Sequence, residues 1–106
     1  MNEVKKWLYK TADLAPMMQR EQSVFVEYYT LETEENDESY NKKKPYGIEV
    51  VKKQIIDGST YREIKRVESI GCDSAQVERL LDLLHRNTVT PITVGDVLED
   101  LSVIRT

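Results

Sequence analysis

Cysteine and histidine are scarce in this chain of 106 residues, which holds one of each, Cys72 and His85. A single cysteine cannot form an internal disulfide, so nothing indicates an oxidising compartment. Zinc sites draw most of their ligands from these two residue types, and one of each plus carboxylates would be an unusual set. Glycines number only 4 and none are clustered. The sequence therefore contains no phosphate-binding loop and no nucleophile elbow.

Long apolar runs are also missing. No stretch approaches the roughly 18 apolar residues of a membrane-spanning helix, and no basic segment leads into an apolar signal core. Acidic side chains number 19 and basic ones 15, which gives a net charge of −4. A negative excess is unfavourable for binding phosphate backbones. We therefore expect a small acidic cytoplasmic protein that does not contact membranes.

What is present fits one folded domain covering residues 1–106. The hydrophobic share of 40% and the charged share of 32% are those of a globular protein. A chain of this size buries about 60–68% of the surface that its unfolded form exposes. That amount of burial supports one ordinary core without disulfides or a structural metal.

Residues 1–22 form an N-terminal arm in this interpretation. Val4, Trp7 and Leu8 lie at the i, i+3, i+4 spacing of a helical turn, and Pro16 ends any helix that begins there. Helices this short are marginal on their own. We expect the arm to be a short helical segment docked through Trp7, or else to be mobile.

Three strands are predicted after the arm. Residues 24–31 are dense in β-branched and aromatic side chains, with apolar groups on both faces, which indicates a central strand. A second strand begins at Tyr46, and the Asp57-Gly58 pair predicts a two-residue turn into a third strand over residues 59–70. The apolar residues of this third strand are spaced by three rather than two, so we expect a β-bulge in it.

A charged segment separates the first two strands. Between residues 32 and 44, five acidic residues are followed by three lysines, and Tyr40 is the only apolar side chain. Because the segment has almost nothing to bury, we expect residues 34–44 to form a mobile, charged hairpin loop.

The last third of the chain is predicted to be helical. Asp73 and Gln76 have the spacing of a capping box at the start of one helix. Thr93 and Asp96 form a second capping pair that would open a shorter helix. The expected fold is therefore α+β, a three-stranded antiparallel sheet followed by two C-terminal helices on one face. The residues expected to share the core are Phe25, Tyr28 or Tyr29, Ile48, Val50, Leu80, Leu81, Leu84 and Leu101.

Two groups of side chains are candidates for chemical sites. Cys72 precedes a helix whose dipole favours a thiolate, but His85 lies late in the same helix, about 20 Å away at ~1.5 Å per residue. The two cannot act as a pair. Asp96, Glu99 and Asp100 share a helix face, as acid–base or Mg²⁺ sites require. We interpret them as a cap and a solvated face.

Basic side chains gather on the second and third strands together with tyrosines. These are ingredients of a platform for single-stranded nucleic acid. No RNP-type sequence accompanies them, and basic residues also protect sheet edges from aggregation. The residues concerned are Lys52, Lys53, Arg62, Lys65 and Arg66.

Several short segments resemble a family of small proteins from clostridia and their relatives, a domain of unknown function. The resemblance covers roughly residues 23–102 and implies a bacterial cytoplasmic origin, but no activity. The segments are 26–29 (VEYY), 44–51 (KPYGIEVV), 89–92 (VTPI) and 96–100 (DVLED).

We therefore expect a regulatory or interaction protein that acts through protein–protein contacts, with another protein or a second copy of itself as partner. The alternative is a nucleic-acid-binding module that uses the basic strands. No catalytic, cofactor-binding or metal-binding residue is assigned, and we expect no enzyme activity. An interface is expected at an open strand edge, or on the sheet face opposite the helices if Tyr28, Tyr46 and Tyr61 form an exposed patch there.

Overall fold

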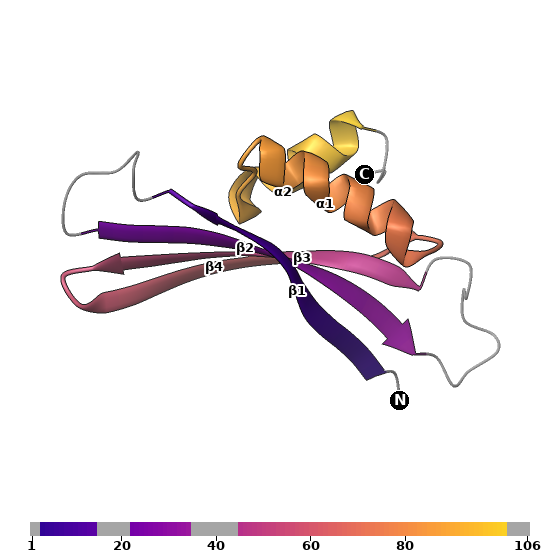
Figure 1. The fold of residues 1–106 in the computed structure, drawn as a ribbon, viewed down its shortest axis with the longest axis horizontal. Coiled ribbons are helices and arrows are strands. Elements are labelled where there is room, and N and C mark those ends of the chain that lie inside the picture. The colour runs from indigo at the N-terminus through magenta and orange to yellow at the C-terminus, as the bar shows by residue number, and fades with distance from the viewer. Residues whose placement is uncertain (1–2, 15–21, 35–44, 102–106) are drawn as a thin grey trace.

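The computed structural model describes residues 3–14, 22–34 and 45–101. Four strands form one antiparallel sheet in the order β1-β2-β3-β4, and two helices lie on one of its faces (Figure 1). The architecture is α+β, with the sheet followed by the helices as predicted. The elements are β1 Glu3–Asp13, β2 Gln22–Glu34, β3 Tyr46–Ile56, β4 Ser59–Gly71, α1 Ser74–Arg86 and α2 Pro91–Asp100.

The sheet has four strands rather than three, because the N-terminal arm is itself a strand. Trp7 lies opposite Thr30 of β2 and Leu8 lies opposite Tyr29, so the two side chains point to opposite faces. Neither enters the core, and Trp7 is 37% exposed. The prediction of a helical or mobile arm was wrong for these residues, because three apolar positions do not identify a helix. Pairing with β2 supplies the backbone hydrogen bonds instead.

The core lies between the sheet and the helices. Along β2, Val26 and Tyr28 alternate toward the helices and pack with α1, as strand geometry requires. Five of the predicted core residues are fully buried, and Leu80 packs partly against them. Phe25 is only half-buried, because it points to the other face of β2. Leu101 is 44% exposed, since it caps the end of α2. Those two assignments were wrong.

The β3–β4 hairpin follows its sequence signals. Asp57 and Gly58 both have positive φ, 50° and 81°, as a tight two-residue turn between strands requires. A bulge lies near the end of β4, after the residues whose spacing suggested one: Tyr46 pairs with Gly71 but Ile48 pairs with Val67. Ser69 within it has φ 59°. Before the bulge, the strand alternates regularly from Ser59 to Val67.

The first helix begins as predicted and the second does not. The Asp73 carboxylate accepts a hydrogen bond from the Gln76 amide at 2.8 Å. The second helix begins at Pro91 with Thr90 as N-cap, three positions before the predicted Thr93 cap. Proline suits the first helical turn because its missing N–H would have no partner there. Asp96 therefore lies inside α2 and is not a cap residue.

The charged segment between β2 and β3 is only partly described. The strand β2 extends to Glu34, so the first acidic residues belong to it and not to a loop. Residues 35–44 lie outside the described part of the chain, and with them the predicted mobile loop.

Candidate functional site

Charged side chains cover the centre of the sheet face that the helices leave open. Glu49, only 3% exposed, accepts hydrogen bonds from Lys6 at 2.7 Å and from Arg66 at 2.9 Å. Burial alone would raise the pKa of Glu49, but these hydrogen bonds and the two positive charges outweigh it, and the pKa is lowered. The amine of Lys6 also lies 4.6 Å from the ring centre of Tyr29. This network ties β1, β3 and β4 together across β2.

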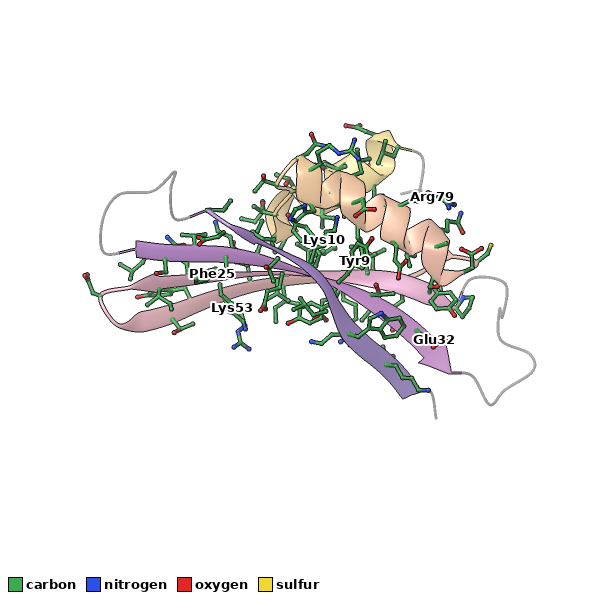
Figure 2. All side chains as sticks on the ribbon, in the orientation of Figure 1. Tyr9, Lys10, Phe25, Glu32, Lys53 and Arg79 are labelled. Carbon is green, nitrogen blue, oxygen red and sulfur yellow. The ribbon has the colours of Figure 1, made fainter. Side chains whose placement is uncertain are left out.

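The basic residues predicted as one patch are divided between the two sheet faces. Lys53 lies opposite Arg62, and Arg66 lies opposite the open-face residue Glu49, whereas Lys65 lies opposite the core residue Val50. Figure 2 shows Lys53 on the far side of the sheet from Lys10, which lies beneath α1.

Three of these basic residues are also neutralised by carboxylates. The ion pairs are Lys52–Glu63 at 3.6 Å, Lys53–Glu27 at 3.1 Å and Arg66–Glu49 at 2.9 Å. The patch expected for nucleic-acid binding is therefore divided and largely compensated.

The condition set for an interface on the open sheet face, an exposed patch of Tyr28, Tyr46 and Tyr61, is not met by these residues. Tyr28 is fully buried beneath the helices, and its hydroxyl donates a hydrogen bond to the Val89 carbonyl at 2.8 Å. Burial raises the pKa of Tyr28 to about 12. Tyr46 packs partly against the core. Only Tyr61 is well exposed, at 57%.

The remaining candidate side chains lie apart or have structural partners. Cys72 is exposed. His85 Nε2 lies 2.9 Å from the Thr11 carbonyl oxygen, and its ring meets Tyr28 edge-on, so it helps to attach α1 to β1. Asp96, Glu99 and Asp100 are exposed along α2. Within residues 3–14, 22–34 and 45–101, no three metal-binding side chains come together.

A second attachment between α1 and β1 was not anticipated from the sequence. Lys10 and Tyr9 both reach Asp82 of α1, at 2.6 Å and 3.2 Å. The register of β1 shifts between Leu8 and Lys10, and this bulge lets two consecutive residues meet the helix. The hydrogen bond from Lys10 lowers the pKa of Asp82.

The end of the β3–β4 hairpin is an exposed part of the sheet. It extends beyond the helices (Figure 1), and a hollow of about 470 Å³ lies there. In the described part of the sheet, β4 has no strand on its outer side. Tyr61 and Ile64 are 57% and 55% exposed on this strand. We call residues 59–67 with the hollow the β4 edge surface. Its hollow is lined by Lys52, Gln54, Ile56, Tyr61, Arg62 and Glu63.

Fold and surface together define an α+β protein with a four-stranded antiparallel meander and two helices on one face, in which the last strand has no neighbour on its outer edge within the described sheet. The chain belongs to a family of unknown function, DUF6514, whose model matches residues 13–103. This confirms the resemblance to a family of unknown function; the clostridial origin stays a prediction. No curated protein and no solved structure matches the chain. Among the described residues, no helix is long and apolar enough to cross a membrane.

Proposed function

We propose that this protein acts through protein–protein contacts, as a regulatory or interaction protein without catalysis, and that it makes these contacts at the β4 edge surface. The observation that carries the proposal is the exposure of Tyr61 and Ile64, both above half, on a strand with one open side in the described sheet. An open strand edge offers backbone N–H and C=O groups to a partner, and apolar side chains beside it add buried area.

The rest of the described surface supports this choice of location. The centre of the open sheet face is occupied by compensated charges, because Glu27 and Glu49 pair with cations there. The other outer strand, β1, is interrupted by the register shift at Leu8 and Lys10, and bulges disfavour strand addition. Strand β4, by contrast, is regular from Ser59 to Val67.

The test compares two substitutions of exposed isoleucines. Immobilised wild-type protein, Ile64→Lys and the control Ile92→Lys are exposed to lysate of the source organism, and captured proteins are quantified by mass spectrometry. Ile92 lies on α2 and is 72% exposed. We expect a captured protein that Ile92→Lys retains and Ile64→Lys loses. Equal capture by both variants would remove the β4 edge surface from the proposal.

The proposal that catalysis is absent has its own test. Purified protein is analysed for metals and its melting temperature is measured against a metabolite collection. A stoichiometric metal, or a reproducible rise in melting temperature with one metabolite, would contradict it. Nucleic-acid binding remains the alternative, and a gel-retardation assay at two salt concentrations tests it, because phosphate contacts weaken steeply with salt.

A further inference from the structure

We propose that the partner of the β4 edge surface is a second copy of the chain. In this dimer the outer edges of two β4 strands pair antiparallel about a two-fold axis at Ile64, which joins two four-stranded sheets into one. This inference rests on the proposed function, since it names the partner of the same surface. It makes the contact isologous, the commonest arrangement of soluble homodimers.

Symmetry limits how two β4 strands can pair. Residues directly opposite each other in an antiparallel pair lie on the same face of the sheet, and side chains alternate between faces along a strand. A two-fold axis perpendicular to the sheet must therefore pass at a residue. A residue that lies a given number of positions after this central residue in one copy then faces the residue that lies the same number of positions before it in the other copy. The regular run of β4, Ser59 to Val67, offers few such centres.

Only one central register matches apolar groups with apolar groups. An axis at Arg62, Glu63, Lys65 or Arg66 would place two identical charges directly opposite each other, which destabilises a strand pair. An axis at Ile64 places the two exposed isoleucines together. A centre nearer either end of the run would pair fewer residues.

The neighbours of Ile64 then also complement each other. Glu63 of each copy faces Lys65 of the other, and Tyr61 faces Val67. Opposite charges and aromatic–β-branched pairs are the cross-strand pairs that stabilise sheets. Arg62 would face Arg66, but the Arg66 charge is compensated by Glu49 at 2.9 Å.

The placement of the helices agrees with this register. Val67 packs against the core beneath the helices, whereas Tyr61, on the same face of β4, is 57% exposed. The two-fold axis reverses the strand, so the helix-covered end of one copy comes beside the uncovered hairpin end of the other. The hairpin end extends past the helices in Figure 1, which leaves room on that face for the second copy.

Charge reversal tests the pairing directly. We expect wild-type protein to associate reversibly to a dimer with rising concentration in analytical ultracentrifugation. Glu63→Lys and Lys65→Glu each bring like charges together at two positions, so each should weaken dimerisation at least tenfold. A mixture of the two variants should restore a dimer, because every Lys then faces a Glu. Arg79→Glu on α1, an exposed site, makes the same charge change as Lys65→Glu and should leave the dimer intact.

A disulfide tests the register. In a Cys72→Ser background, Ile64→Cys should give a disulfide-linked dimer under mild oxidation. The Cα atoms of directly opposite residues are about 4.5–5.5 Å apart, which is within the range that a disulfide spans. Arg79→Cys in the same background should not give a linked dimer. A wild-type chain that stays monomeric at every concentration overturns the dimer, as does a dimer unaffected by the Glu63 and Lys65 reversals. If a different captured protein is still lost on Ile64→Lys, the proposed function survives while this inference fails.

Discussion

Gly47 lies directly beneath the backbone of β4, so close that a Cβ atom built on it would be 2.4 Å from the Val67 carbonyl oxygen and 2.8 Å from the Glu68 Cα. The contact occurs where the β4 bulge passes over β3. Only a residue without a side chain fits, because backbone atoms and not a flexible side chain occupy the space. The bulge and the glycine therefore depend on each other.

Gly47→Ala should accordingly lower the free energy of unfolding by at least about 1–3 kcal/mol, the usual cost of forcing a methyl group into a packed site. Denaturant titration measures the change. The matched control is Gly95→Ala in α2, where a Cβ atom would meet nothing within 4 Å. That variant should be neutral or more stable by up to about 1 kcal/mol, because alanine favours the helix. An equal effect of both substitutions would contradict the packing at the bulge.

Leu81→Ala tests the core between α1 and the sheet. Leu81 is fully buried and belongs to the cluster that joins both helices to β2 and β3. The truncation should cost about 2–5 kcal/mol of unfolding free energy, because it removes apolar contact and leaves a cavity. Leu101→Ala, at an exposed position, should stay within about 0.5 kcal/mol. A loss below that value for Leu81→Ala would rule out the assigned helix face.

Acid stability should depend on Glu49. Its pKa is lowered in the folded protein from an ordinary value of 4.5, so its contribution is fully present above that pH and is lost as the pH falls through the folded pKa. Glu49→Gln should lower the unfolding free energy at neutral pH by about 1.5–3 kcal/mol, the worth of hydrogen bonds to a charged group. The substitution should also flatten the decline of the unfolding free energy below about pH 4.5.

The comparison for this prediction is Glu68→Gln at an exposed position. That variant should follow the wild-type pH profile. The acid sensitivity left in Glu49→Gln is expected partly from Asp82, whose pKa is lowered by its hydrogen bond from Lys10. If Glu49→Gln and wild type lose stability in parallel below pH 4.5, the buried carboxylate is not the origin of the pH dependence.

The parts of the fold with strong local signals were predictable from the sequence. The Asp57-Gly58 turn needs positive φ at both residues, and Asp73 caps the helix that follows it; both are properties of neighbouring residues. The strand β1 was not predictable in this way. Its apolar side chains do not alternate, and what makes it a strand is the edge of β2, which the chain reaches only after residue 22. Local pattern cannot reveal a distant partner.

Local sequence pattern was also insufficient to predict the charge of the candidate surface. The basic residues of β3 and β4 are visible in the sequence, but their neutralisation depends on register. Glu27 reaches Lys53 from the next strand, and Glu49 reaches Arg66 across the β3–β4 ladder. The exposed edge itself could have been inferred, since the last strand of a meander lies on the outside of its sheet. What could not be inferred is that Tyr61 would lie beyond the helices, while Ile64, opposite Val51, would point to the open face of the sheet.

Tyr28→Phe tests the attachment of the α1–α2 connection to the sheet. The Tyr28 hydroxyl donates to the Val89 carbonyl at 2.8 Å inside the core. Removing the hydroxyl leaves a buried carbonyl without this donor, so the unfolding free energy should fall by about 1–3 kcal/mol. Tyr61→Phe, at the exposed hairpin end, should change it by less than about 0.5 kcal/mol. If the two variants unfold at the same denaturant concentration, the hydroxyl of Tyr28 contributes nothing to holding the helices on the sheet.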